Sequence, residues 1–280
     1  MNEDSVSTTL QPAYILHYTL WRESSFIVDA FTLSHGRISL MAKSARASKA
    51  RTRALYQPFR PLLLSWVGGS ELRTLTGIEE SGAPLSLADT ELACGYYFNE
   101  LVLRLLGKDQ PQPAVFAHYA VALANLATVD TVQPGDLQAV LRTFELQLLD
   151  GLSVLPDLAR CTADGSAIDA NRMYRYHPAN AIAVASNRLA EGQLSLGIQK
   201  QKTRMGDADH RDPSVQADGV TPDEGVMVSG RTLLALSSLT LDDAQVLEEA
   251  RILMRRILRV HLGDRPLKSR ELFDTLVRRD

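Results

Sequence analysis

The residue types that perform catalysis or bind metals are scattered along this sequence. Its histidines and cysteines are His17, His35, His118, His177, His210, His261, Cys94 and Cys161. The histidines show no HxxxH or HExxH spacing, and the cysteines form no CxxC pair. Because a structural zinc site needs about four such ligands close together, we expect no metal and no cofactor.

Motifs for nucleophilic catalysis or nucleotide binding are missing as well. The sequence has no GxSxG elbow, no P-loop and no GxGxxG. The carboxylate pairs Glu79-Glu80 and Glu248-Glu249 are adjacent, so their side chains diverge on a strand or a helix. Cys94 stands in an apolar helical stretch, where a buried, inert thiol is the default. We therefore expect a protein that is not an enzyme.

Positive charge is concentrated in one stretch, although the net charge of the protein is −3. Residues 30–70 contain no Asp or Glu, and their cations are Arg37, Lys43, Arg46, Lys49, Arg51, Arg53 and Arg60. Neutralising phosphates requires cations without neighbouring anions. We predict that these side chains form a DNA-binding site. The alternative, which stays open, is a solvated basic loop with no ligand.

Aromatic residues accompany this basic stretch. Proteins that bind single strands combine a cationic track with aromatic rings on which bases stack. The nearby aromatics are Phe26, Phe31, Tyr56, Phe59 and Trp66. The plainer alternative is that they fill a hydrophobic core, and we expect this of Phe26 and Phe31.

A second basic feature recurs near the end of the chain. Arg251, Arg255 and Arg259 are spaced by four residues, so on a helix they form one stripe. With Lys268 and Arg270 they could form a secondary site for an anion or for the acidic tail of a partner. The plainer alternative is a solvated face, partly paired with Glu248 and Glu249.

The first eighty residues predict a small β-barrel. Short runs rich in β-branched and aromatic residues span 13–20, 25–32, 37–42, 60–67 and 71–78. Gly36 is suited to a tight turn, and Gly68-Gly69 to a hairpin. Five such strands fit an oligonucleotide-binding (OB) fold, although strand count alone also allows an SH3-like barrel. Residues 43–53, between the third and fourth strands, predict a mobile connection.

Beyond Pro84 the hydrophobic period becomes helical. We expect helices near 92–106, 114–127 and 137–149, and a long one capped by Thr240 with Asp243 and ended by Gly263. Residues 161–186 are typical of a small irregular or hairpin lobe. Residues 201–225 have few apolar side chains and predict a flexible polar loop. The predicted organisation is an α+β protein with an OB-fold DNA-binding domain at 1–82 and a mainly α-helical domain at 83–280.

No apolar run approaches the roughly 18 residues that a membrane span needs. The N-terminus is polar, without the basic start and apolar segment of a secretion signal. We expect a cytoplasmic protein associated with the nucleoid and not with membranes.

Several patches together resemble the RecO family of bacterial recombination mediators. Near the N-terminus they are Ala13-Tyr-Ile-Leu-His17, Arg22-Glu-Ser-Ser25, Asp29-Ala-Phe-Thr32, His35-Gly-Arg37, Met41-Ala-Lys-Ser-Ala-Arg46 and Leu55-Tyr-Gln-Pro-Phe59. The helical region contributes Tyr97-Phe-Asn-Glu-Leu101, Phe144-Glu-Leu-Gln-Leu148, Arg259-Val-His-Leu-Gly263 and Leu267-Lys-Ser-Arg270. They occur in the family's order along nearly the whole chain.

The resemblance implies a function in recombinational DNA repair without enzymatic turnover. It implies binding of single- and double-stranded DNA, annealing of complementary strands, and partnership with RecR. It also implies contact with the acidic C-terminal tail of single-stranded DNA-binding protein, so that RecA loads on coated strands. Many members carry a four-cysteine zinc module, whereas this chain has only Cys161 in that neighbourhood, which indicates a zinc-free subtype. The competing class is an OB-fold adaptor that binds proteins and not DNA.

Overall fold

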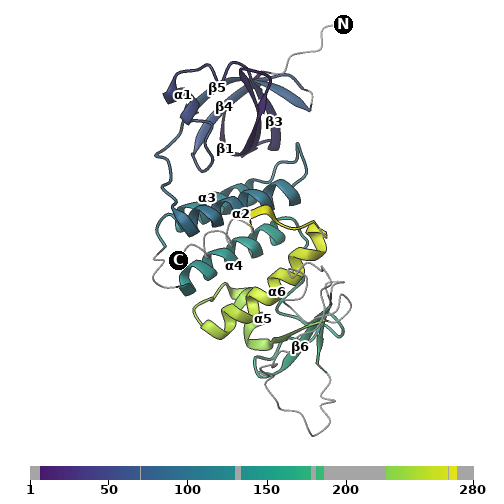
Figure 1. Ribbon diagram of the computed structural model, residues 1–280. Helices are drawn as coiled ribbons and strands as arrows, with labels where there is room; N and C mark the ends of the chain where they lie inside the picture. The colour runs from purple at the N-terminus through teal and green to yellow at the C-terminus, as the bar shows by residue number, and fades with distance from the viewer. Residues whose placement is uncertain are drawn as a thin grey trace, which may run out of the picture.

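The computed structural model describes residues 7–69, 71–129, 134–177, 181–185, 225–263 and 265–269. Along the view of Figure 1, a β-barrel, a layer of helices and a small sheet follow one another. Chain order and spatial order therefore broadly agree, except that the last long helix returns from the small sheet toward the first helices.

The N-terminal region is a closed five-stranded barrel. Its strands are β1 (Ser7–Trp21), β2 (Ser25–Thr32), β3 (Gly36–Ala42), β4 (Leu62–Val67) and β5 (Leu72–Glu80). The order around the barrel is β1-β2-β3-β5-β4, with β1 pairing with β4 to close it and β3 parallel to β5. This Greek-key order is that of the OB fold and resolves the alternative left open by strand count. The fold is thus α+β, as the sequence predicts.

The first strand is longer than its hydrophobic pattern indicates. Residues 7–13 of β1 pair with β4, and residues 13–21 pair with β2. Residues 7–12 pair with β4 alone, and the hydrogen bonds of that ladder define this part of the strand without an alternating hydrophobic pattern. The sequence therefore locates the second half of β1 and misses the first.

Residues 13–16 of β1 are buried on both faces of the strand. Ala13 and Ile15 point into the barrel core, and Tyr14 and Leu16 point out into the core of the helical region. Successive side chains of a strand point to opposite faces, so this one segment contributes to two cores. From Tyr14 onward β1 pairs only with β2, and residues 17–22 are exposed.

The helical region consists of α2 (Asp89–Leu105), α3 (Pro113–Leu126), α4 (Pro134–Gly151), α5 (Gly230–Ser238) and α6 (Ala244–Leu262). The apolar face of α2 buries Cys94, Phe98 and Leu101 at helical spacing. The three helices expected between residues 92 and 149 are present, with ends shifted by a few residues. The short helix α5 is an addition that the sequence did not reveal.

The start of α6 differs from the prediction. The N-cap is Asp243 and not Thr240: the Asp243 carboxylate accepts hydrogen bonds from the backbone N–H groups of Gln245 and Val246, each at 3.0 Å. Thr240 precedes the helix, with its hydroxyl beside that of Ser238. A carboxylate that accepts two free N–H groups at the positive end of a helix is the stronger cap. Gly263 ends α6 at φ 69°, as expected.

The predicted hairpin lobe is part of a three-stranded sheet. β6 (Met173–His177) pairs with β7 (Ala181–Val184) on one edge and with β8 (Val226–Ser229) on the other. β8 went unrecognised in the sequence because its four residues directly follow the polar stretch. The predicted loop at 201–225 lies outside the described residues, apart from Gly225.

A buried hydrogen-bonded chain joins the barrel to the helices. Asn99 of α2 donates through Nδ2 to the carbonyl oxygen of Leu16 at 2.8 Å, and the Tyr119 hydroxyl of α3 donates to Asn99 Oδ1 at 2.6 Å. Tyr119 also contacts the rings of Tyr14 and Phe31 edge-on. The Leu16 carbonyl, the Asn99 amide and the Tyr119 hydroxyl therefore satisfy one another where water cannot reach them.

We predict that Asn99→Ala lowers the free energy of unfolding by about 2–4 kcal/mol. The substitution leaves a buried carbonyl and a buried hydroxyl without their partner, each at a cost of about 1–3 kcal/mol. Urea denaturation followed by circular dichroism measures the loss. The exposed Asn125 of α3 offers a matched control, and Asn125→Ala should change stability by less than about 0.5 kcal/mol. Equal effects of the two substitutions would contradict a stabilising role of the hydrogen bonds that Asn99 makes with Leu16 and Tyr119.

Candidate nucleic-acid interface

The stretch Lys43–Arg53, hereafter the basic segment, has a defined structure where the sequence predicts a mobile connection. Residues 43–47 form turns, with Ser44 at φ 57°, and the short helix α1 (Ala50–Ala54) follows. The sequence misses this order because the segment has no apolar periodicity of its own.

Contacts with the barrel hold the basic segment in place. Ala45 is buried in the barrel core, together with Leu55 and Tyr56 just beyond α1. The backbone N–H of Arg46 donates to the carbonyl oxygen of Ser24 at 2.9 Å, which joins the segment to the turn between β1 and β2. Ala45 and the backbone hydrogen bond of Arg46 therefore anchor a segment whose Lys and Arg side chains are exposed.

Five of the seven predicted cations gather on this segment. Lys43, Arg46, Lys49, Arg51 and Arg53 are all exposed. Within the part of the chain that the structure describes, none of them forms an ion pair. Exposed cations on a supported segment, without competing carboxylates, are what phosphate neutralisation requires.

The other two predicted cations lie apart and have protein partners. Arg37 Nε donates to the carbonyl oxygen of Leu106 at 3.1 Å, beyond the end of α2. Arg60 pairs with Glu80 at 3.1 Å, and only 19% of its side chain is exposed. A cation absent from the predicted set, Arg73 of β5, pairs with Asp109 at 2.6 Å. Arg37 and Arg73 thus help hold the barrel against the helical region.

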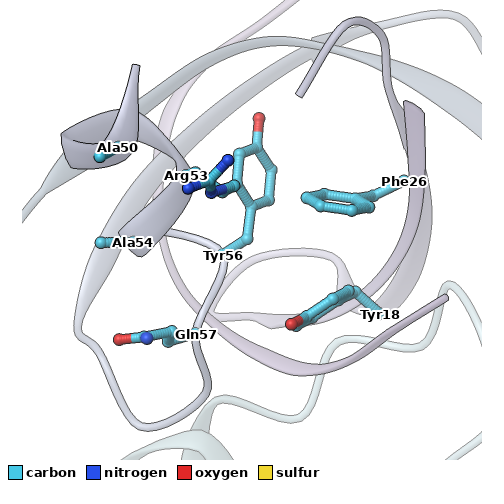
Figure 2. Close-up of a pocket in the computed structure, with 7 residues that line it drawn as sticks. All are labelled: Tyr18, Phe26, Ala50, Arg53, Ala54, Tyr56 and Gln57. Carbon is cyan, nitrogen blue, oxygen red and sulfur yellow. The ribbon is translucent and has the colours of Figure 1, made fainter. Parts of the chain in front are cut away.

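The five aromatic residues named from the sequence are all buried in one of the two cores. The expected core packing of Phe26 and Phe31 is therefore confirmed. Phe26 and Tyr56 are 4% and 6% exposed and line a pocket beside α1, which Figure 2 shows. Tyr18, which the sequence did not single out, also lines the pocket and is 38% exposed.

The stripe on α6 is partly occupied by acidic neighbours. Arg251 makes two hydrogen bonds to Glu248, from Nε at 2.9 Å and from Nη2 at 2.6 Å. Arg255 lies close enough to Glu248 for its positive charge to help lower the pKa of that carboxyl, after the larger effect of the Arg251 hydrogen bonds. Arg259 is exposed. These contacts favour a solvated face for the N-terminal half of the stripe.

Glu249 takes no part in that stripe, contrary to the pairing expected from the sequence. Its carboxylate accepts hydrogen bonds from Ser229 N and Oγ and from the Thr232 hydroxyl, at 2.7–3.0 Å, and so supports the start of α5. Burial alone would raise the pKa of Glu249, but these hydrogen bonds outweigh it and hold the pKa below its usual value.

The remaining residues of the predicted secondary site lie at the chain's end. Lys268 is exposed, and its backbone N–H donates to Glu100 of α2 at 3.0 Å. Arg270 lies outside the described residues. Of the five cations predicted for this site, the structure thus describes three on α6 and Lys268 just beyond that helix.

The described residues offer little for covalent or metal chemistry. Burial raises the pKa of the Cys94 thiol to about 12, so it stays protonated at neutral pH. Cys161 is buried and donates to the carbonyl oxygen of Ile182. Among the described residues, no three His, Cys, Asp or Glu side chains are placed to hold a metal ion. None of the described helices is both long enough and apolar enough to span a membrane.

Comparison with known proteins gives a consistent result along the chain. A family model described as "Recombination protein O N terminal" matches residues 6–82, and one described as "Recombination protein O C terminal" matches residues 90–212. A DNA repair protein RecO of Methylococcus capsulatus is 37% identical over 96% of this chain and 95% of its own length. Proteins of the same name from Haemophilus influenzae (strain 86-028NP) and Alkalilimnicola ehrlichii are 35% and 38% identical, each over 96% of this chain and over 97% and 92% of their own lengths.

The hydrogen bond between Arg37 and Leu106 predicts that Arg37 contributes to stability, whereas an exposed cation such as Arg46 does not. We expect Arg37→Ala to lower the free energy of unfolding by about 1.5–3 kcal/mol, because a hydrogen bond from a charged donor to a carbonyl is lost. Arg46→Ala, which removes an exposed side chain, should change it by less than about 0.5 kcal/mol. Chemical denaturation of both variants checks this, and a stability unchanged by Arg37→Ala would contradict the assignment.

Proposed function

Because this chain belongs to the RecO family of DNA repair proteins, we propose that it binds single- and double-stranded DNA through the basic segment and serves as a recombination mediator. The observation that carries the proposal is the set of five exposed cations without ion-pair partners among the described residues. They stand on a segment that the barrel supports from beneath. The proposed role needs no chemical turnover and would be performed on nucleoid DNA in the cytoplasm.

Strand annealing is the activity that this surface suits best. Two complementary strands repel each other through their phosphates, and a cationic surface that neutralises part of this charge lowers the barrier to their encounter. Long Lys and Arg side chains reach phosphate oxygens without covering the hydrogen-bonding edges of the bases. The bases of a bound strand therefore remain available to a second strand.

The finer steps of the proposed role concern protein partners. We propose that the protein acts together with RecR and contacts the acidic C-terminal tail of single-stranded DNA-binding protein, so that RecA gains access to coated strands. The α6 stripe is the candidate surface for such a tail. Arg259 is exposed, whereas Arg251 is half-buried, so the Arg259 end of the stripe is the more accessible part of this surface.

The first prediction of this proposal is a strong salt dependence of binding to single strands. If about five cations engage phosphates, the slope of log K against log salt is about −3.5. Fluorescence polarisation with a labelled single strand across a salt series measures that slope. In a variant with Lys43, Arg46, Lys49, Arg51 and Arg53 changed to Ala, binding should weaken and most of the slope should disappear.

A matched control separates this site from the overall charge of the protein. Five exposed cations outside both predicted sites are Arg160, Arg172, Arg175, Arg231 and Arg265. Changing these to Ala alters the net charge equally, and we expect the slope of the wild type to persist. Equal loss in the two variants would mean that only net charge matters. Absence of DNA binding by the wild type would favour a protein-binding adaptor.

The second prediction concerns the stripe. A variant with Arg251, Arg255 and Arg259 changed to Glu should bind a peptide of the acidic tail at least about tenfold more weakly, since several cation–carboxylate contacts of up to 1 kcal/mol each become repulsive. The charge of Arg255 acts on the buried carboxyl of Glu145, so its reversal could also disturb folding. Arg259→Glu alone therefore serves as the milder variant. Calorimetric titration with the peptide measures the affinity. Unchanged binding by both variants would remove the stripe from the proposal.

A further inference from the structure

A pocket opens between the barrel wall and the basic segment. It is lined by Tyr18 of β1, Phe26 of β2, Arg53 and two alanines of α1, and Tyr56 and Gln57 just after that helix. Its volume is about 310 Å³, at the lower end of the roughly 300–1,000 Å³ of ligand pockets. Figure 2 shows α1 on one side of this space and the strands carrying Phe26 and Tyr18 on the other.

Three aromatic rings line the pocket and contact one another in series. The Tyr18 and Phe26 ring centroids lie 4.9 Å apart at 44°, and those of Phe26 and Tyr56 lie 5.3 Å apart at 70°. Phe26 and Tyr56 are nearly buried, so they cannot move away easily, whereas Tyr18 keeps 38% of its surface exposed. A ring that is exposed on one side and braced on the other provides a preorganised stacking surface.

Polar groups around the rings suit a flat, hydrogen-bonding ligand. The Gln57 side chain is exposed and offers both a donor and an acceptor. The Arg53 guanidinium can stack on a π face or bind a phosphate. The Tyr56 phenol, whose pKa burial raises, is also protonated at neutral pH.

We propose that this pocket accepts an unpaired base of a single DNA strand, which stacks on Tyr18 while the flanking phosphates lie against the basic segment. The inference rests on the proposed DNA-binding function and adds to it a subsite that distinguishes single strands from duplexes. In a duplex the bases are stacked inside the helix and their faces are unavailable, so only the phosphates of a duplex would engage this surface.

Charge complementarity favours a nucleic-acid base over other flat ligands. Arg53 belongs both to the pocket lining and to the set of five exposed cations, so the pocket lies within the cationic surface. A strand that places a phosphate on Arg53 therefore has a neighbouring base close to the pocket. Stacking is tolerant of sequence because every base has a π face, which suits a mediator that must bind any strand.

The experiment compares two strands that carry the same phosphates. One is an ordinary labelled single strand, and the other has the same length but contains a run of abasic sites. Stacking is worth roughly 1–3 kcal/mol per base, so we expect the wild type to bind the ordinary strand about tenfold more tightly. Tyr18→Ala should bind both strands alike, at the wild-type affinity for the abasic strand, with an unchanged salt slope.

Two further variants control for the ring and for folding. Tyr18→Phe keeps the aromatic face and should keep most of the preference for bases. Leu20→Ala removes another exposed apolar side chain of β1, which is 64% exposed and does not line the pocket, and should behave like the wild type. Thermal melting of each variant shows that the fold is retained.

The possible results separate the failure of the pocket from the failure of DNA binding. If the wild type binds both strands equally and with strong salt dependence, the basic segment binds DNA but the pocket does not hold a base. The same conclusion holds if Tyr18→Ala keeps the full preference for the ordinary strand. If the wild type binds neither strand in a salt-dependent manner, the proposed function is wrong and the pocket proposal is overturned with it.

Discussion

The arrangement of this protein depends on one strand segment that is buried on both faces. Within β1, residues 13–16 send Ala13 and Ile15 into the barrel and Tyr14 and Leu16 into the helical core. The carbonyl oxygen of Leu16, which lies under the helices, is satisfied by Asn99. Since an unpaired buried carbonyl is costly, α2 can pack on the barrel only in a position that places Asn99 here. The barrel and the helices are thereby held in one fixed relation.

In this arrangement some cations of the barrel bind other parts of the protein, and others are exposed to solvent. Where the barrel meets the helical region, Arg37 and Arg73 are taken up by a carbonyl and by a carboxylate. On the basic segment, which contacts the barrel through Ala45 and the backbone of Arg46, the cations have no described ion-pair partners. A cation that already has a partner gains less from a phosphate than one surrounded only by water. The cations without described ion-pair partners therefore occupy a shorter stretch of sequence than the run without acidic residues.

Buried polar groups organise the helical region in the same manner. Glu145 of α4 accepts hydrogen bonds from Arg142 at 2.8 Å and from the Tyr97 hydroxyl at 2.6 Å. Burial raises the pKa of Glu145, and these neighbours only partly offset that rise. Glu100 of α2 holds the chain beyond α6 through the N–H groups of Lys268 and Ser269. The first set of contacts thus joins α4 to α2, and the second ties the residues that follow α6 to α2.

The sequence alone determined the local features. Alternating apolar residues located the strands, the change to helical spacing located α2 to α4, and the run without acids indicated where a polyanion would bind. These signals suffice because they depend on neighbours in the chain. The sequence also predicted the fold class, and the resemblance of its patches pointed to the family that the comparisons show.

Tertiary structure decided the features that depend on distant residues. Arg37 donates to the carbonyl of Leu106, and Arg60 pairs with Glu80, so two of the seven predicted cations have protein partners that the sequence did not indicate. Tyr18 and Tyr56 line one pocket although they are far apart in the chain. Local sequence patterns do not predict these long-range contacts, because the energy of a charge or a ring depends on which groups the folded chain places beside it.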